Sequence, residues 1–438
     1  MVIFITLVAI IVVAFFVLSR KEKSPNTQNN GLNTSIIDDK NIKIVHVTDI
    51  HYLSPSLTDY GKSFVDTIEK SDGKMMRYID QIMDAFVLEM IRIKPDLVIV
   101  SGDMTYNGEK ESHIGLANKF KLLKDKGIKV LVLPGNHDLE NEMALAFEGH
   151  TTRPVETVTI EEFEEIYKDY GYGKDDPDVV SRDKKSLNYV YQLGNKCHLI
   201  MVETSTKGND QTISNSSYRW IEKWLRKAKD MNMRVIGVSH QNILAHNKLF
   251  IAGYKITNSS RLVDLYNKYN VRINLSGHMH IQHMAEHKRV HDIALACLGL
   301  YPNLYGVLDM DLRNNMTYHT ESLDVAYWMK KYKHQDSDLL DFENTSRKYF
   351  VRCTRLQTEK QLAKLDLSKE DKEMMMDFMV DTNIHYFSGS LDKRPDLSPD
   401  NPAYKLWMDH CERTFTGSYL NSIYTDTIGD HNMLEIFQ

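Results

Sequence analysis

Short apolar runs that end abruptly in polar residues recur five times along the chain. A run of this length, bounded by turn residues, is typical of a buried strand whose end opens into a polar loop. The clearest example is residues 129–138, where Lys-Val-Leu-Val-Leu is followed by Pro-Gly and then by Asn136, His137 and Asp138. The other four runs are residues 43–47, 97–100, 234–238 and 271–275, which lead into Asp49 and His51, Asp103, His240, and His278 and His280. Because α/β proteins usually bind ligands beyond the carboxyl ends of their strands, we predict that all five strands deliver these side chains to the same edge of a sheet.

Helical patterns alternate with these strands. Residues 74–93 carry an apolar stripe at helical spacing that Pro95 stops, and residues 111–126 form a second helix that Gly127 ends. A third helix begins at Thr159 and Glu162, which have the spacing of a capping box. This strand–helix–strand order predicts an α/β fold with a parallel or mixed sheet.

Further strands are predicted after the third helix. Residues 187–192 and 197–202 are expected to pair as a hairpin around Gly194 and Asn195. The three runs that follow the last polar cluster are interpreted as closing strands of a second sheet: residues 292–297, 305–310 and 316–319.

The composition changes near residue 321, where long helical patterns replace short strands. Helix starts are predicted at Ser368 and at Asn401-Pro402. We therefore divide the folded chain into a sandwich domain at 41–320 and a helical C-terminal region at 321–438.

The N-terminal residues form a separate region. Residues 1–19 are almost entirely apolar and precede Arg20, Lys21 and Lys23. This length is at the lower limit of a spanning helix, so the segment is predicted to be a single-pass transmembrane anchor, with a cleaved signal peptide as the alternative. Residues 20–40 are polar and are expected to form a flexible linker. The protein is thus predicted to be held at a membrane through its N-terminal helix, on a side that the sequence leaves open.

Charge and cysteine content exclude several classes of function. The formal net charge of −6 gives no basic surface for a nucleic-acid backbone, so no nucleic-acid polymer is expected as a partner. The four cysteines lie far apart and form no Cys-x-x-Cys pair, which predicts buried thiols rather than a thiolate zinc site or a disulfide framework.

The polar clusters themselves predict a metal centre. Imidazole, carboxylate and amide oxygen are ligands for hard or borderline divalent metals. The seven candidate ligands exceed the needs of one ion, and a pair of ions bridged by a carboxylate would use them all. The candidates are Asp49, His51, Asp103, Asn136, His240, His278 and His280.

The motifs D-x-H, G-D, G-N-H-D, H and G-H-x-H, in this order and each after a strand, resemble those of the calcineurin-like metallophosphoesterases. The run from Gly102 to Glu109 is similar to their class III branch, the cyclic-nucleotide-phosphodiesterase-like enzymes. The resemblance covers residues 42–312. It implies a two-sheet αββα sandwich and a phosphate-ester substrate, either a phosphomonoester or a phosphodiester.

The resemblance also implies a role for each residue of the motifs. One ion would be held by Asp49, His51 and His280, and the other by Asn136, His240 and His278. Asp103 would bridge the two ions, which would be Mn, Fe or Zn, and a hydroxide bridging them would attack the phosphorus. His137 would face the scissile phosphate as the catalytic acid or charge stabiliser.

Several residues near the motifs have alternative interpretations. Asp138 either orients His137 or caps a following helix, and Asn107 either contacts phosphate or belongs to a turn. The fourth motif reads His-Gln-Asn where many relatives have His-His-Pro, which is expected to change the substrate-side wall. His246 and His283 are interpreted as surface residues or as residues behind the ligands.

An alternative function is a membrane-tethered binding or scaffold protein that keeps the fold without turnover. The sequence does not identify the protein partners. A missing ligand would favour this alternative, and the motifs lack none.

Overall fold

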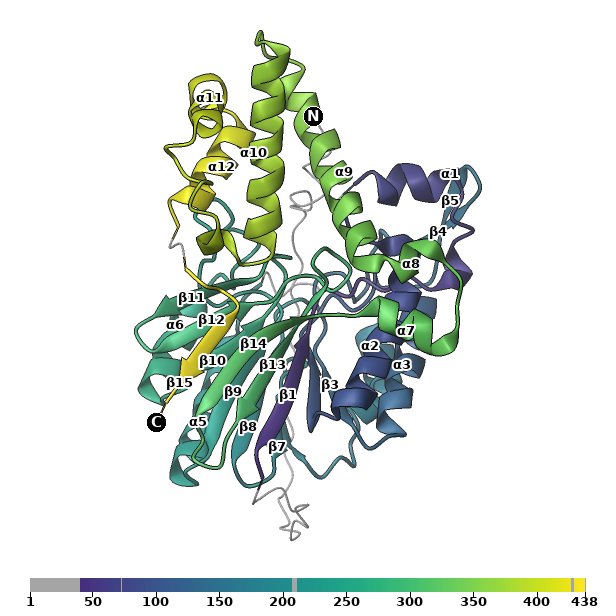
Figure 1. Ribbon diagram of the computed structural model, residues 1–438. Coiled ribbons are helices and arrows are strands. Elements are labelled where there is room, and N and C mark those ends of the chain that lie inside the picture. Colours follow the sequence, from purple (N-terminus) through teal and green to yellow (C-terminus); the bar gives the residue numbers. More distant parts are fainter. Residues whose placement is uncertain (1–39, 72, 207–210, 427–428, 438) are drawn as a thin grey trace, which may run out of the picture.

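Two β-sheets packed face to face form the centre of the protein in the computed structural model, which describes residues 40–71, 73–206, 211–426 and 429–437 (Figure 1). The first sheet has six strands in the order β15-β14-β13-β1-β2-β3. β1 is parallel to β2 and antiparallel to β13. The strand bounds are β1 Ile42–Val47, β2 Leu97–Val100, β3 Lys129–Val132, β13 Leu304–Met310, β14 Met316–Ser322 and β15 Met433–Ile436.

The second sheet has seven strands in the order β11-β12-β10-β9-β8-β7-β6. β7 and β8 pair as the predicted hairpin, with Leu193 opposite Cys197. The bounds are β6 Val179–Arg182, β7 Tyr189–Leu193, β8 Cys197–Val202, β9 Arg234–Ser239, β10 Ile273–Ser276, β11 His283–His287 and β12 Val290–Ala294. A separate two-stranded sheet consists of β4 Leu145–Glu148 and β5 Thr151–Pro154.

Two predictions about sheet membership are wrong. The five motif strands do not lie in one sheet, because β1, β2 and β3 belong to the first sheet and β9 and β10 to the second. Nor do the last strands close a second sheet together: β13 and β14 extend the first sheet beside β1, and only β12, which ends at Ala294, lies in the second. The apolar pattern shows that a run is buried, but the pairing depends on which strands are brought together by the long connections between them.

Helices cover the outer faces of both sheets, which gives four layers. The first sheet is covered by α2 Ile79–Ile93 and α3 Lys110–Lys124, the second by α5 Asn215–Asp230 and α6 Ser259–Lys268 (Figure 1). The inner faces of the two sheets share one large apolar core. Strands buried on both faces read as nearly continuous apolar runs, as β2 does with Leu-Val-Ile-Val. The predicted mixed α/β fold with two sheets is confirmed.

Shorter elements connect these layers. The helix predicted at Thr159 is present as α4, and Thr159 and Glu162 form the expected capping box. The bounds of α4 are Ile160–Ile166. The other short helices and helical turns are η2 Pro55–Leu57, α1 Lys62–Phe64, η3 Val65–Glu69, η4 Met76–Tyr78 and η5 Lys168–Tyr170.

The C-terminal helices rise above the edge of the sheets (Figure 1). Ser368 caps α10, and Asn401 caps α11 with Pro402 in its first turn, as predicted. α7 and α8 join the core of the first sheet, whereas α9 to α12 form a second cluster that also includes residues of the sandwich domain such as Met279 and Ile281. The bounds are α7 Val325–Tyr332, α8 Ser337–Leu340, α9 Phe342–Leu362, α10 Lys369–Phe387, η6 Leu391–Lys393, α11 Pro402–Cys411 and α12 Phe415–Tyr424. The region is not helical to its end, because β15 returns to pair with β14.

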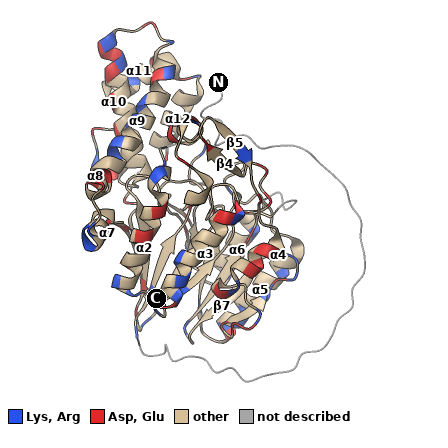
Figure 2. Cartoon of the chain, turned by 90° about the vertical axis from the view of Figure 1, so that its right-hand side faces the viewer, with Lys and Arg blue, Asp and Glu red and all other residues tan. Residues whose placement is uncertain are grey.

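The anchor predicted for residues 1–19 and nearly all of the linker predicted for 20–40 lie outside the described residues. Within the described part of the chain, no helix has the length and apolar character needed to cross a bilayer. Charged residues of both signs are distributed over the helices and loops, while the strands are largely uncharged (Figure 2). All four cysteines are buried, and no disulfide bond joins them in the described part of the chain.

Candidate metal centre

The loops that follow β1, β2, β3, β9 and β10 meet at one end of the two sheets. Backbone hydrogen bonds join the first two loops, since Asp49 N donates to Gly102 O at 3.0 Å and His51 N to Asp103 O at 2.9 Å. The loops of the second sheet are joined in the same way by Gly277 N and His240 O, 3.0 Å apart. The seven candidate ligands are thereby brought to one place from two sheets.

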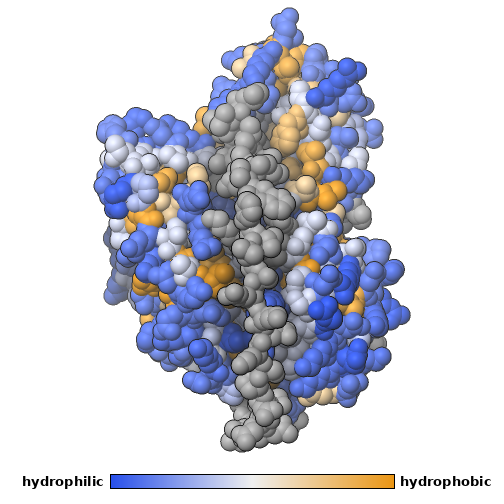
Figure 3. Space-filling view, turned by 180° about the vertical axis from the view of Figure 1, so that it is seen from behind, coloured by the Kyte–Doolittle hydropathy of each residue, from blue (hydrophilic) through white to orange (hydrophobic). Residues whose placement is uncertain are grey.

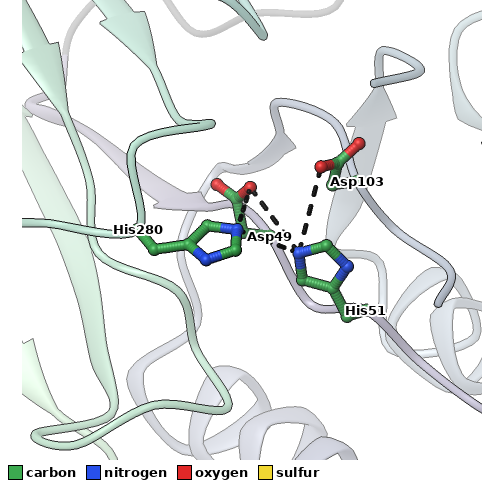
Figure 4. A group of neighbouring side chains, drawn as sticks. All are labelled: Asp49, His51, Asp103 and His280. Atoms are coloured by element: carbon green, nitrogen blue, oxygen red, sulfur yellow. Dashed lines mark hydrogen bonds and ion pairs between the residues drawn. The ribbon is translucent and has the colours of Figure 1, made fainter. Parts of the chain in front are cut away.

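Four of them form a first group: Asp49, His51, Asp103 and His280 (Figure 4). Asp49 Oδ1 lies 3.2 Å from His280 Nε2. The two imidazoles approach each other with their Nε2 atoms 3.0 Å apart. Asp49 and His51 are fully buried, while His280 is partly exposed. This group can surround a single cation with oxygen and nitrogen donors.

Asp103 also belongs to a second group, with His240 and His278. Its Oδ1 lies 3.3 Å from His240 Nε2, whereas its Oδ2 faces His51 Nε2 of the first group at 3.9 Å. Asn136 Oδ1 joins the second group at 3.1 Å from His240 Nε2. One carboxylate therefore presents one oxygen to each group, which is the arrangement of a bridging ligand.

The hydrogen bonds of the second group leave two of its ring nitrogens available to a cation. His240 Nδ1 donates to Ser101 O at 3.0 Å, and His278 Nε2 donates to Gly253 O at 2.9 Å. A histidine that donates from one ring nitrogen presents a lone pair on the other. His240 Nε2 and His278 Nδ1 then face each other at 3.2 Å, so a proton or a metal ion is needed between them.

The first group shows the same need. Nε2 of His51 and Nε2 of His280 face each other at 3.0 Å, and Asp49 Oδ1 beside them is buried without a hydrogen bond among the described residues. Buried polar atoms are rarely left unpaired, because the loss of hydration costs about 1–3 kcal/mol for each group. Oxygen and imidazole donors without thiolate fit Mn, Fe or Zn, so the residues present are suited to the metals that the sequence predicts.

The backbone at the centre is strained. Five of the seven candidate ligands have a left-handed φ between 46° and 69°. A residue other than glycine in this conformation costs about 1–3 kcal/mol, and such residues cluster at functional sites. They are Asp49, His51, Asp103, His278 and His280. The surrounding hydrogen bonds hold these residues in place.

Glycines in the motifs make room for the carboxylates. A Cβ atom on Gly135 would lie 2.2 Å from Asp103 Oδ1 and 2.3 Å from the Asp103 backbone nitrogen. A Cβ on Gly277 would lie 2.4 Å from Asp49 Oδ2. Gly135 and Gly277, which precede Asn136 and His278, are therefore required by close packing against the ligand of a neighbouring loop.

Gly135→Ala is expected to displace Asp103 and to reduce bound metal to less than half, because the added methyl group meets backbone as well as side chain. Metal content measured by elemental analysis of the purified protein tests this expectation. Gly429→Ala is the matched control, since a Cβ there meets nothing within 4 Å. Full metal content in Gly135→Ala would contradict the packing argument.

The electrostatics of the centre are dominated by Asp103 and His240. Burial raises the pKa of Asp103, but the neighbouring His240 and His137 hold it well below its usual range. Burial lowers the pKa of His240, but the Asp103 carboxylate raises it to about 9. Burial together with His240 lowers the pKa of His278 to about 4. Without metal, a proton on His240 thus balances the carboxylate, and a cation that binds there releases this proton.

His137 lies beside the two groups and not within them. Its Nδ1 donates to Tyr106 O at 2.8 Å and to Asn107 Oδ1 at 2.9 Å. Its Nε2 stands 3.9 Å from Asp103 Oδ2, and the side chain is 35% exposed. Asn107 therefore positions His137, a role that the sequence did not indicate because the contact joins two loops 30 residues apart.

Asp138 neither orients His137 nor caps a helix. Its buried carboxylate accepts from Met104 N, Thr105 N and Gly135 N at 2.8–3.1 Å. Both alternatives considered for this residue are wrong, since the loop continues without a helix. Asp138 instead ties the Asp103 loop to the loop that carries Asn136 and His137.

Gln241 and Asn242 do not form a substrate-side wall. Both are buried, and Gln241 Nε2 donates to Ser205 Oγ at 3.1 Å, while Asn242 Nδ2 donates to Ser276 Oγ at 2.9 Å. The expected change in that wall is therefore not found. These two side chains brace the loop after β9 from behind.

His246 and His283 are buried, so the interpretation as surface residues is wrong. Their Nδ1 atoms lie 3.0 Å apart. His246 Nε2 lies 3.3 Å from Asp292 Oδ2, and His283 Nε2 lies 3.4 Å from Asp426 Oδ2. This chain of four side chains links β12 to the C-terminal segment, and Asp292 in turn accepts from Ile243 N at 2.6 Å near the β9 loop.

Comparison with known proteins agrees with this geometry. Residues 42–282 match the family of calcineurin-like phosphoesterases, and residues 324–430 match the C-terminal domain of cyclic nucleotide phosphodiesterase. The chain is 25% identical over 300 residues to a probable glycerophosphodiester phosphodiesterase, GpdQ, of Arcobacter nitrofigilis, and the match covers 66% of this chain and 89% of that protein.

Two solved phosphatase structures are similar to the chain at low sequence identity. A dimetal phosphatase from Danio rerio aligns at 12% identity with a TM-score of 0.46, over 65% of this chain and 97% of its own. A purple acid phosphatase from yellow lupin, Lupinus luteus, aligns at 12% identity with a TM-score of 0.40, over 65% of this chain and 52% of its own.

The match over more than half of the chain identifies the family, and the match of the C-terminal region identifies the branch. The chain belongs to the calcineurin-like phosphoesterases, in their cyclic-nucleotide-phosphodiesterase-like branch, and is a metal-dependent phosphoester hydrolase.

Proposed function

We propose that the protein is a binuclear phosphodiesterase in which Asp103 bridges two metal ions. The observation that carries the proposal is the division of the Asp103 oxygens, one toward His240 and one toward His51. Asp49, His51 and His280 would hold one ion, and Asn136, His240 and His278 the other. Bound there, two cations supply a water nucleophile of lowered pKa and neutralise the phosphoryl oxygens.

The residues around the ions have distinct tasks in this proposal. The buried ligands Asp49, His51, Asp103 and His240 form the floor of the site, whereas Asn136 is exposed and His137 partly exposed. The substrate phosphate therefore approaches from the side of Asn136 and His137. With its Nδ1 hydrogen held by Tyr106 O and Asn107 Oδ1, His137 presents Nε2 to the leaving oxygen, and it would protonate that oxygen in its doubly protonated form, which burial disfavours and the Asp103 carboxylate favours.

The names of the relatives support a diester over a monoester. One relative is named as a glycerophosphodiester phosphodiesterase, and the C-terminal region matches a domain named for cyclic nucleotide phosphodiesterase. Both names describe substrates with two ester bonds to phosphorus. The tether through residues 1–19 stays part of the proposal and would place this hydrolysis at a membrane.

Removal and return of metal tests the proposed centre. The full chain is stripped with a chelator, loaded with Mn²⁺, Fe²⁺ or Zn²⁺, and assayed with bis(p-nitrophenyl) phosphate and p-nitrophenyl phosphate, while elemental analysis counts the bound ions. We expect two ions per chain, turnover only after loading, and faster hydrolysis of the diester. A fully active protein with one ion per chain would contradict the binuclear proposal, and faster hydrolysis of the monoester would contradict the diester preference.

A further inference from the structure

A pocket with aromatic walls lies between the metal centre and the C-terminal helices. Its cavity volume is about 80 Å³, well below the roughly 300–1,000 Å³ of typical small-molecule sites, so it can take only one small group and not a whole substrate. Seven of its thirteen lining residues are Phe or Tyr, and no charged residue of the described chain lines it. Seen from behind, apolar side chains also gather on the upper part of the molecule, where the C-terminal helices lie (Figure 3).

The pocket shares a wall with the metal centre. His278 and His280 point to the metal groups, whereas Met279 and Ile281 between and after them line the pocket. The Tyr254 ring, another part of the lining, lies 5.2 Å from the His278 ring. The pocket therefore adjoins the metal-binding side chains and is separated from them by a single layer of residues.

Rings from the loop after β9 and from the C-terminal helices form the walls. The Phe250 ring lies 5.2 Å from that of Tyr254 and 6.3 Å from that of Phe415 on α12. The rings of Phe350 on α9 and Phe387 on α10 lie 5.4 Å apart. Aromatic faces and edges at these distances favour another ring, because their quadrupoles add a preference beyond apolar burial.

We propose that this pocket binds a planar aromatic group that is esterified to the phosphate at the metal centre. The inference rests on the proposed function, since the phosphate must lie at the metal pair for the attached group to reach the pocket. It assigns specificity to the C-terminal helices, which supply Phe350, Phe387, Phe415 and Tyr419 to the walls. The catalytic sandwich alone would lack most of the pocket.

Phosphonates test the pocket without turnover. Methylphosphonate, hexylphosphonate and benzylphosphonate carry the same head group, and benzylphosphonate has a methylene group where a phenyl ester has oxygen. Their dissociation constants are measured by calorimetry on the metal-loaded full chain. We expect benzylphosphonate to bind at least about tenfold more tightly than methylphosphonate, from burial of the ring, and at least about threefold more tightly than hexylphosphonate.

Two variants locate the ring. Phe415 is 44% exposed, so Phe415→Ala removes a wall with little effect on the fold, and it should weaken benzylphosphonate binding at least about threefold. Thr354→Phe fills the pocket from α9 and should remove the advantage of benzylphosphonate. Methylphosphonate should bind both variants as it binds the unmodified protein. Leu356→Ala is the matched control, since this exposed α9 side chain lies outside the pocket.

The outcomes separate the inference from the proposed function. If methylphosphonate fails to bind the metal-loaded protein, the proposed function fails and the inference with it. If methylphosphonate binds and benzylphosphonate gains nothing, or keeps its gain in both variants, only the inference is overturned. Equal binding of hexylphosphonate and benzylphosphonate overturns it as well, because the pocket would then accept an alkyl chain and not specifically a ring.

Discussion

Asp103→Asn is expected to lower kcat/KM for a phosphodiester by at least about 10³-fold and to reduce bound metal below two ions per chain. Asp103 faces both candidate metal groups, and its replacement removes the negative charge that would hold two cations together. Loss of an ion removes several kcal/mol of transition-state stabilisation, and about 4 kcal/mol corresponds to this factor. Asn has nearly the same shape and can still accept from His137 N, as Asp103 Oδ1 does at 2.9 Å.

The measurement combines steady-state kinetics, elemental analysis and thermal unfolding of the same preparation. Thermal unfolding shows whether the variant keeps its fold, so that lost activity can be assigned to the centre. Asp125→Asn, at an exposed carboxylate beside Lys121, is the matched control and should change neither activity nor metal. Undiminished hydrolysis by Asp103→Asn would exclude Asp103 from the centre.

His137→Ala is expected to keep both metals and to slow the hydrolysis of alkyl esters by about 10²–10⁴-fold, the range for lost acid–base assistance. His137 lies outside both metal groups, and its Nε2 stands 3.9 Å from Asp103 Oδ2. An alkoxide leaving group needs a proton, whereas p-nitrophenolate leaves readily without one. The loss should therefore be much smaller for a p-nitrophenyl ester than for an alkyl ester.

The ratio of the two losses distinguishes acid catalysis from a structural effect, which would slow both substrates equally. His150→Ala, at an exposed histidine, is the control. Loss of metal from His137→Ala would show that this residue is a ligand. An equal loss for both esters would show that His137 stabilises charge and does not protonate the leaving group.

Local patterns in the sequence predicted the elements of the fold. The stripe at 74–93 appears as a helical turn and α2, which ends at Ile93 before Lys94 and Pro95 as the proline requires. The caps at Thr159, Ser368 and Asn401 are present because capping depends on residues two or three positions apart. These features depend on neighbours along the chain, and the sequence contains those neighbours.

The positions of the seven candidate ligands were also visible in the sequence. Each follows a short apolar run, and a strand that ends at its sheet edge places the next residues in a loop there. The sequence did not reveal how the loops support the ligands. The carbonyl of Ser101 orients His240, and the carbonyl of Gly253 orients His278. Asn107 positions His137 in a similar way. These contacts join segments 25 to 139 residues apart, at positions that no local pattern marks.

The sequence by itself therefore determined the strands, the helices and the residue types of the centre, because hydrophobic periodicity and capping are local. Only the tertiary structure decided that β1 to β3 and β9 to β10 belong to different sheets, and that Asp103 faces both metal groups from between them. It also brought α9, α10 and α12 against the loop of His278 and His280, where Met279 and Ile281 pack among their side chains. Pairing and packing of this kind depend on which apolar faces fit together across long separations, and a linear pattern does not contain that information.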